Sequence, residues 1–259
     1  MPEPTLPILP IAELLSGKEP PVSWLVNNLL PRGSLIALAG EPGAGKSFVS
    51  YTLSLCLASG VDFLGFGIES PAKVLYFDQE NSRPDTTQYL RWSWIGLNRP
   101  TLPQIESNLA IAHFALGTHD WLSKAQSYVL SVKPELIIID TATPALAIDD
   151  ENDNGEAAKA IGKLRTLQGL LSPSPAIIVL KHAKVKSEDG AYTLRGAKAW
   201  EGQVDGIIYQ IRSAGNPRLD GLRSTSLVPA KTRAFGLRDT VKINPEWTEE
   251  RAGLRLSRK

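Results

Sequence analysis

A glycine-rich segment at residues 40–47 constrains the fold of this 259-residue chain more than any other feature. Its sequence, Gly-Glu-Pro-Gly-Ala-Gly-Lys-Ser, is the complete G-x-x-x-x-G-K-S/T pattern of a phosphate-binding loop. The apolar run 34–39 before it predicts a buried strand, and the pattern over 47–59 predicts a helix that Gly60 ends. Because the motif lies between a strand and a helix, we expect an α/β fold with a nucleoside triphosphate at this loop.

The chemistry of the loop gives each of its parts a task. Its glycines let backbone N–H groups turn toward phosphate oxygens, and the helix N-terminus adds the positive end of its dipole. The Lys46 ammonium can reach the β- and γ-phosphates, and the Ser47 hydroxyl can ligate Mg²⁺. We therefore expect ATP and Mg²⁺ as cofactors. The expected nucleotide-binding residues are Gly40, Glu41, Pro42, Gly43, Ala44, Gly45, Lys46, Ser47 and Phe48.

Strand patterns alternate with helical patterns along the rest of the chain. Alternation of this kind favours right-handed crossovers and a mostly parallel, twisted sheet with helices on both faces. Shorter patterns after residue 206 predict additional antiparallel strands at the C-terminal end. The expected strands are 34–39, 73–78, 108–114, 135–140, 176–181, 207–211, 224–229 and 240–243, and the expected helices are 47–59, 83–97, 119–132 and 156–171.

The chain is expected to have three parts. They are a proline-rich N-terminal arm at 1–33 with a short helix near 11–15, a core domain at 34–243, and a C-terminal edge strand or basic tail at 244–259. An apolar stripe in the arm would dock it either on the core domain or on a neighbouring subunit. The stripe consists of Trp24, Leu25, Leu29 and Leu30.

Polar residues follow the strong strands at the edge where ligands of such sheets bind. Asp140 ends the strand 135–140 and is expected to hold the Mg²⁺ shell. After the strand 73–78, Glu80 is the candidate for deprotonating the attacking water, because a carboxylate within one water of the γ-phosphate suits general-base work. The motif alone leaves Asp78 as the alternative, but Asp78 is nearer the strand, where a structural role is expected. His182 ends another strand and is expected to sense the γ-phosphate.

The composition excludes several classes of protein. A net charge of +1 argues neither for nor against a polyanionic partner, and a single cysteine, Cys56, excludes an intrachain disulfide. No apolar run is long enough to predict a membrane span. Since residues 1–10 do not resemble a signal peptide, we expect a cytoplasmic protein without a membrane partner.

Together these motifs resemble the RecA-like P-loop ATPases, and within them the AAA_25 or RepA group, which includes plasmid-type hexameric replicative helicases. The resemblance rests on 40–47, 78–80, 137–140 and His182, on the entry segment 24–33, and on 194–202 and 204–208. A later Lys231-Thr-Arg233 also matches the group.

The resemblance implies roles that the chemistry alone leaves open. Lys231 and Arg233 match the K-x-R that one subunit inserts into the ATP site of its neighbour, which implies a shared active site and a homo-oligomer, here a hexameric ring. Together with Lys46, Glu80 and His182, they are the expected catalytic residues.

Family members bind DNA with two loops, which here correspond to 141–155 and 183–200. The first is acidic, which is unlike a loop that contacts phosphates. The second is basic and suits backbone contacts to a single strand, with Trp200 or Tyr192 as stacking candidates. The expected nucleic-acid-binding residues are Lys184, Lys186, Arg195 and Lys198.

Three functions fit these features. The first is an ATP-dependent helicase or translocase on single-stranded DNA. The second is a recombinase-like filament ATPase that binds DNA stoichiometrically, and the third is a regulatory ring ATPase without nucleic acid.

Overall fold

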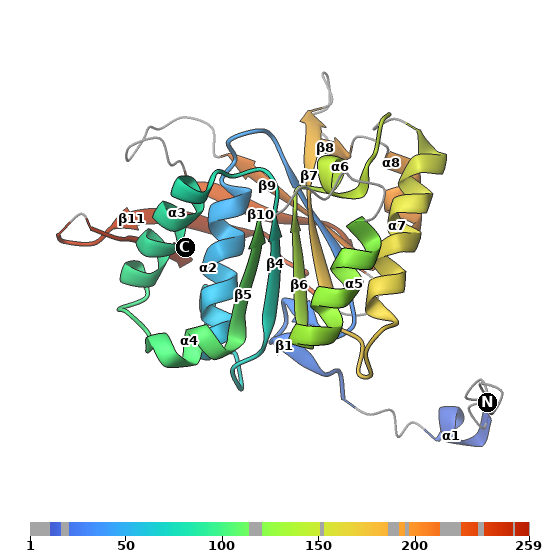
Figure 1. Ribbon diagram of the computed structural model, residues 1–259, viewed down its shortest axis with the longest axis horizontal. Helices are drawn as coiled ribbons and strands as arrows, with labels where there is room; N and C mark the ends of the chain where they lie inside the picture. The colour runs from blue at the N-terminus through green and yellow to red at the C-terminus, as the bar shows by residue number, and fades with distance from the viewer. Residues whose placement is uncertain are drawn as a thin grey trace.

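A central β-sheet with helices on both faces forms the body of the protein (Figure 1). The computed structural model describes residues 11–16, 21–113, 121–150, 153–185, 192–194, 197–212, 224–232, 236–250 and 252–258. The order of the strands along the sheet is β12-β11-β10-β9-β3-β7-β6-β4-β5, and a short β8 pairs with β7. The expected α/β architecture is therefore confirmed, with a parallel centre and antiparallel C-terminal strands.

The central strands are parallel and the C-terminal strands antiparallel, as expected, whereas the short β8 was not expected. The parallel strands are β3 (Leu35–Gly40), β4 (Val74–Asp78), β5 (Leu109–His113), β6 (Leu136–Asp140), β7 (Ala176–Val185) and β9 (Gly206–Arg212). The antiparallel ones are β8 (Tyr192–Leu194), β10 (Thr225–Thr232), β11 (Val241–Trp247) and β12 (Leu254–Arg258). Helices cover both faces of the central strands, which explains why β3, β4 and β6 are buried along their whole length.

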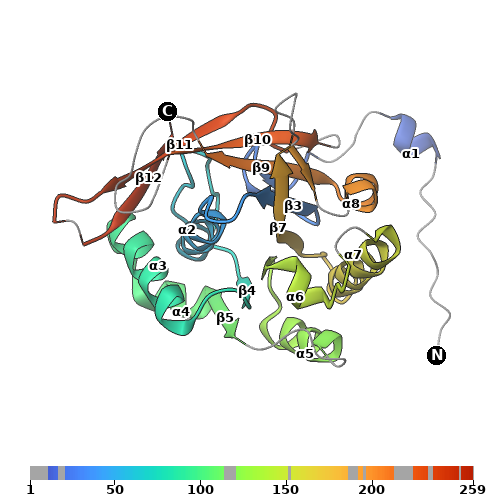
Figure 2. The same cartoon turned by 90° about the horizontal axis from the view of Figure 1, so that it is seen from above.

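Two hydrophobic cores lie on opposite faces of the sheet, because successive side chains of a strand point to opposite faces. Leu35 and Ala37 of β3 belong to one core, whereas Ile36 and Leu38 belong to the other. The first core packs against α5 (Trp121–Val132), α6 (Ala142–Leu146), α7 (Asn154–Gln168) and α8 (Ala197–Gln203). The other face carries α2 (Lys46–Ser59), α3 (Arg83–Gly96) and α4 (Leu102–Asn108), and Figure 2 shows the two groups of helices on either side of the sheet.

Helix α2 connects the glycine-rich loop to the core. It is buried on nearly its whole circumference, as expected for a helix packed between a sheet and other helices. Gly60 ends it in the left-handed conformation, and its N–H donates to the Cys56 carbonyl. No described helix is long and apolar enough to cross a membrane.

The apolar stripe of the N-terminal segment docks on the chain's own body. Strands β1 (Trp24–Val26) and β2 (Leu30–Pro31) form a small sheet, and Leu25, Leu29 and Leu30 are at most 5% exposed in the second core. Burial of each such side chain contributes about 1.5–3 kcal/mol. Helix α1 (Ile11–Leu15), in contrast, lies away from the body (Figure 1).

The body of the protein extends beyond the limits expected for the core domain. Residues 24–31 pack into it on the N-terminal side. On the C-terminal side, β11 runs through residue 244 and pairs with β12, so the expected edge strand is an integral part of the large sheet.

Candidate functional site

The glycine-rich loop connects β3 to α2 at the carboxyl edge of the parallel strands. Gly40 is in register with His182 of β7 on one side and with Gln210 of β9 on the other. A Cβ atom on Gly40 would lie 2.5 Å from the Gln210 carbonyl oxygen, so no larger residue fits between these strands. Gly43 and Gly45 have φ angles of 69° and 86°, the left-handed region that glycine adopts without strain. The loop therefore has the backbone of a phosphate cradle.

Lys46 lies folded back on the loop. Its ammonium donates to the carbonyls of Gly40 and Glu41 at 3.1 and 3.2 Å, and the residue is 6% exposed. Burial lowers the pKa of Lys46, and the nearby carboxylates of Glu80 and Asp140 partly offset this effect. Since both of these acceptors are neutral carbonyls, the ammonium is well suited to exchange them for the oxygens of a triphosphate.

Asp140 ends β6 beside the loop and is fully buried. The Tyr76 hydroxyl donates to its Oδ2 at 2.7 Å, and Oδ1 has no hydrogen-bond partner among the described residues. Burial raises the pKa of this carboxyl to about 6, while the hydrogen bonds from Tyr76 and Ser47 oppose the shift. A buried carboxylate oxygen with spare acceptor capacity beside the Ser47 hydroxyl fits the water shell of a Mg²⁺ ion. The two residues expected to hold the metal are thus brought together.

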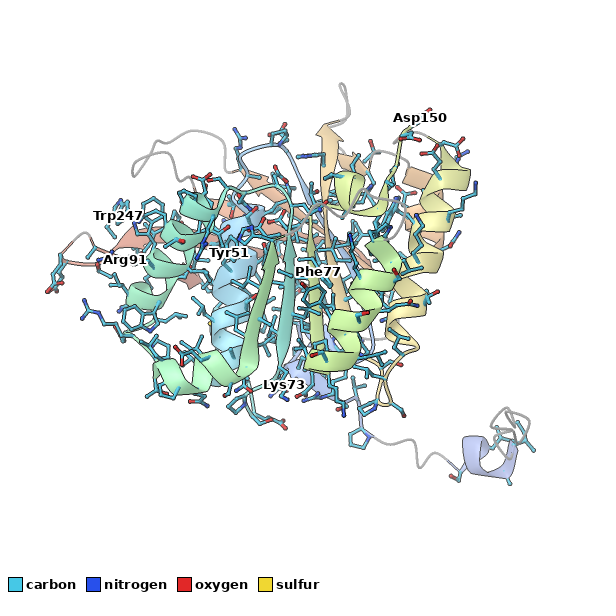
Figure 3. All side chains as sticks on the ribbon, viewed as in Figure 1. Tyr51, Lys73, Phe77, Arg91, Asp150 and Trp247 are labelled. Carbon is cyan, nitrogen blue, oxygen red and sulfur yellow. The ribbon has the colours of Figure 1, made fainter. Side chains whose placement is uncertain are left out.

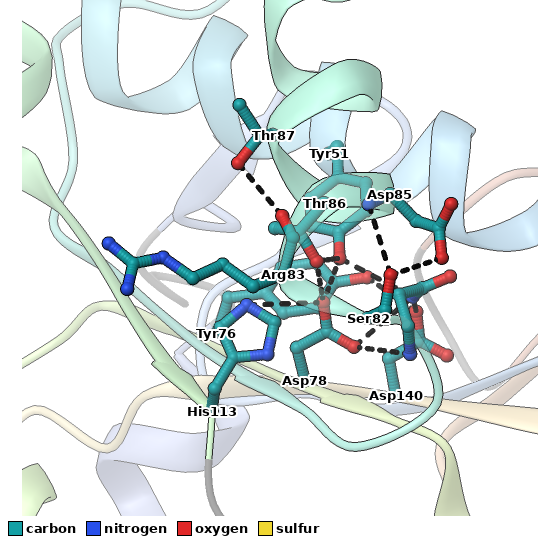
Figure 4. Close-up of polar contacts among 11 residues, drawn as sticks. Tyr51, Tyr76, Asp78, Ser82, Arg83, Asp85, Thr86, Thr87, His113 and Asp140 are labelled. Atoms are coloured by element: carbon teal, nitrogen blue, oxygen red, sulfur yellow. Dashed lines mark hydrogen bonds and ion pairs between the residues drawn. The ribbon is translucent and has the colours of Figure 1, made fainter.

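Asp78 ends β4 in register with Asp140 but has a different environment (Figure 4). The hydroxyls of Tyr51 and Thr86 donate to its Oδ2, the latter at 2.6 Å. The backbone N–H and the side-chain amide of Asn81 both donate to its Oδ1 at 3.1 Å. Four donors occupy the acceptor positions of this carboxylate, so Asp78 is committed to holding its surroundings together.

Glu80 lies in the turn after β4 with an exposed side chain. Its negative charge opposes the lowering of the Lys46 pKa and adds to the raised pKa of Asp140, so the Glu80 carboxylate lies close enough to interact with both groups. His182 is half-buried and level with Gly40 on the adjacent strand. Lys46, Ser47, Glu80, Asp140 and His182 therefore gather at one edge of the sheet, while Phe48 turns its ring toward Tyr89 in the core, with 6.1 Å between ring centroids.

Lys231 lies apart from this group. It pairs with Ile207 near the start of β9, whereas the phosphate loop lies at the end of β9. Its ammonium donates to the carbonyls of Glu201 and Gly202 at the end of α8. Arg233 lies outside the described residues. Within one chain, Lys231 therefore lies toward the amino ends of the parallel strands, whereas the phosphate loop lies at their carboxyl ends.

The segment expected to be a flexible DNA-binding loop has regular structure in its described parts. Strand β7 continues past His182, and its residues Ala183, Lys184 and Val185 pair with β8. Lys198 is exposed on α8, while Lys186 and Arg195 lie outside the described residues.

The idea that Trp200 stacks on bases is wrong. Its ring is completely buried in the first core, and the Lys181 ammonium lies 4.4 Å from the ring centroid. The charged residues and glycines of this segment predicted a surface loop. Composition does not reveal that a helix, α8, forms here and turns the Trp200 ring into the core. The side chain of Tyr192 is outside the described part of the chain.

The acidic segment after β6 uses its charges locally. Asp153 caps α7 by accepting the N–H groups of Gly155 and Glu156. The Glu156 carboxylate in turn accepts the N–H groups of Asp149 and Asp150 at 2.7 and 3.0 Å. Two carboxylates, those of Asp153 and Glu156, therefore stabilise the start of α7 and the bend before it, which accounts for part of the unusual acidity.

Strand β9 contributes two residues that sequence reasoning missed. The Gln210 amide donates to the Ala44 carbonyl at 2.8 Å, and the Arg212 guanidinium donates to the Pro42 carbonyl. The positive charge of Arg212 also contributes to the lowered pKa of Lys46. No motif marks these positions, because their proximity to the loop follows from strand order alone.

Comparison with known proteins agrees with this geometry. The AAA_25 family model, described as an AAA domain, matches residues 2–188. The fold is similar to that of a KaiC-like protein from the hyperthermophilic archaeon Pyrococcus horikoshii OT3, with a TM-score of 0.60 and 18% identity over 91% of this chain and 99% of that one. The chain therefore belongs to the AAA_25 family and is a RecA-like P-loop ATPase.

Proposed function

We propose that this protein is an ATP-driven motor of the replicative helicase type, which moves along single-stranded DNA as a homohexameric ring. The observation that carries the proposal is the course of β7. His182 is level with the phosphate loop, and two residues later the same strand reaches Lys184, which pairs with β8. A shift of β7 on ATP hydrolysis would therefore move the basic segment directly.

The hydrolytic step is assigned to the residues around the phosphate loop. Glu80 deprotonates the attacking water, because Asp78 has its acceptor positions filled by protein donors. Lys46 binds the β- and γ-phosphates, and Ser47 and Asp140 hold Mg²⁺, which supplies charge neutralisation at the phosphates when it is bound. Lys231 and Arg233 complete the site of the neighbouring subunit.

The position of Lys231 supports a shared site. A cation at the far edge of the sheet cannot serve its own phosphate loop, but it can reach the loop of an adjacent copy in a head-to-tail ring. In the single chain Lys231 contacts the carbonyls at the end of α8, the helix that carries Lys198. In the proposed ring, Lys231, which would contact the neighbouring subunit, is therefore bound to the same helix that carries a residue of the basic segment.

The test is ATP turnover with and without single-stranded DNA. Turnover should rise with DNA, and Lys198→Ala should weaken the stimulation while leaving turnover without DNA unchanged. Lys73→Ala is a matched control, because this lysine is also exposed. It lies at the opposite end of the molecule from Asp150, which belongs to the first of the two segments expected to face DNA (Figure 3). Stimulation should be the same in this control as in the unmodified protein.

A regulatory ring ATPase is the second candidate, because the acids of 149–153 lie where a first DNA-binding loop is expected. Turnover that stays flat with DNA would overturn the motor proposal and favour this candidate. Stimulated turnover with open helical filaments in electron micrographs, and without strand displacement on a forked duplex, would instead indicate a recombinase.

A further inference from the structure

The turn that carries Glu80 is held at both ends by buried groups. Before it, the Gln79 N–H donates to the Asp140 carbonyl at 2.7 Å. After it, the Asn81 N–H donates to the Asp78 carboxylate at 3.1 Å. The backbone position of Glu80 is therefore set by its two neighbours.

The side-chain amide of Asn81 lies between two carboxylates. Its Nδ2 is 3.1 Å from Oδ1 of Asp78 and 3.4 Å from Oδ2 of Asp140. These acids are register partners on adjacent strands (Figure 4), and both side chains are almost completely buried. An amide nitrogen has two hydrogens and carries no charge, so it can donate to both carboxylates.

The hydroxyl of Tyr51 shows that this arrangement is a connected network. It donates to Asp78, lies 3.1 Å from the Thr86 hydroxyl, and is 3.4 Å from the Asn81 amide nitrogen. Its ring stacks on that of Tyr76, whose hydroxyl donates to Asp140. Displacement of the turn would break several of these hydrogen bonds at once.

We propose that Asn81 is a positioning residue, whose amide joins the turn that carries Glu80 to the Asp140 carboxylate. The two carboxylates that face the γ-phosphate then keep a fixed spacing during turnover. This inference rests on the proposed function, because it takes Glu80 as the general base.

Two substitutions separate the amide from the rest of the residue. Asn81→Ala removes the amide, and Asn81→Asp keeps its shape but puts a third carboxylate beside Asp78 and Asp140; both keep the backbone N–H. The turnover number should fall about 10–100-fold in Asn81→Ala, as for other residues that orient metal ligands, and further in Asn81→Asp. ATP affinity should change by less than about twofold, since Asn81 does not contact the phosphate loop.

A matched control comes from the same segment. Thr87→Ala removes a 2.8 Å hydrogen bond to the Arg83 carbonyl on the exposed side of α3 and should turn over ATP normally. A second readout needs no nucleotide or metal. Hydrogen–deuterium exchange over residues 79–81 should be faster in both Asn81 variants and unchanged in Thr87→Ala.

A double variant identifies the route by which Asn81 acts. If it acts through the base, Glu80→Gln/Asn81→Ala should be as slow as Glu80→Gln alone. A double variant slowed by the full product of the two single effects would show that Asn81 acts independently of Glu80 and would overturn the inference.

Failure of the inference and failure of the proposed function give different results. If Glu80→Gln hydrolyses ATP at the normal rate, the assignment of the base is wrong, and the role of Asn81 falls with it. If Glu80→Gln is inactive but both Asn81 variants have normal turnover and exchange, only the positioning role is wrong.

Discussion

Two inactive variants should restore each other's activity if the active site is shared between subunits. The variants are Lys46→Ala, which loses the phosphate loop lysine, and Lys231→Ala. Lys231 pairs with Ile207, and Ile207 pairs with Ala37, three residues before Gly40. Lys231 is therefore about 10 Å from Gly40 along the strands and about 10 Å across two strand spacings, beyond the reach of a lysine side chain in the same chain.

The expected rescue follows from counting interfaces. In a head-to-tail ring, each interface takes its loop from one subunit and its lysine from the next. In an equal mixture with random assembly, about a quarter of the interfaces combine an intact loop with an intact Lys231. Phosphate release at constant total protein should therefore reach about a quarter of the normal rate after subunit exchange, while each variant alone has lost at least about 90% of turnover.

A control mixture fixes the interpretation. Lys46→Ala and Asp140→Asn affect the same half of the site, so their mixture should remain inactive at every ratio. If Lys46→Ala and Lys231→Ala also fail to rescue each other, Lys231 acts within its own chain. Its bonds to the carbonyls at the end of α8 would then be its main role, and the shared-site model would be refuted for this residue.

Three other predictions test stability and the metal site. Gly96→Ala would put a Cβ atom 2.0 Å from the Leu254 carbonyl oxygen and should destabilise the fold by about 1–3 kcal/mol or more, whereas Gly162→Ala meets no atom within 4 Å and should stabilise it by about 0.5–1 kcal/mol. Denaturant unfolding measures both, and a shift in the same direction would contradict the packing argument. Burial raises the pKa of the Cys56 thiol to about 12, so the native protein should react slowly with a thiol reagent at pH 8 until it is unfolded. Because this pKa is raised by folding, the stabilising contribution of the neutral thiol should be complete below the unfolded pKa of about 8.5 and decline as the pH rises above it, which unfolding curves against a Cys56→Ala control would detect. Asp140→Asn should reduce Mg²⁺-dependent turnover at least about 100-fold, and binding of a fluorescent ATP analogue without Mg²⁺ should persist.

The fold was predictable wherever the hydrophobic periodicity of a segment agrees with the residues that end a helix or a strand. The strand at 135–140 and the helix ended by Gly60 have both signals, and the structure has β6 and α2 there. The segment 183–200 was expected to be a loop because glycines and charges interrupt its pattern. The structure has β8 and α8 there, since pairing with β7 and burial of Trp200 stabilise short elements that lack a pattern of their own.

The candidate site was predictable only at the ends of strong strands. Asp140 ends β6, Glu80 lies in the turn after β4, and Lys46 lies at the end of the loop that follows β3, so the topology of a parallel sheet is enough to bring them together. Arg212 and Asn81 could not be predicted, because their contacts depend on which strand lies beside which and on the exact course of a turn. Neighbours of this kind are set by tertiary structure, and single-sequence patterns contain no signal for them.

The site also shows how one sheet can give two similar carboxylates different tasks. Asp78 and Asp140 end adjacent strands in register and are both buried, so their position in the fold is almost the same. Their donors differ: Asp78 accepts four hydrogen bonds, whereas one oxygen of Asp140 has no donor among the described residues. The stacked pair Tyr51 and Tyr76 contributes to this difference, because each hydroxyl donates to a different carboxylate. The number of donors, and not the position in the sheet, therefore distinguishes the two carboxylates. Under the proposed mechanism, this difference leaves an Asp140 oxygen available for the water shell of a cation, whereas Asp78 holds the turn that carries Glu80.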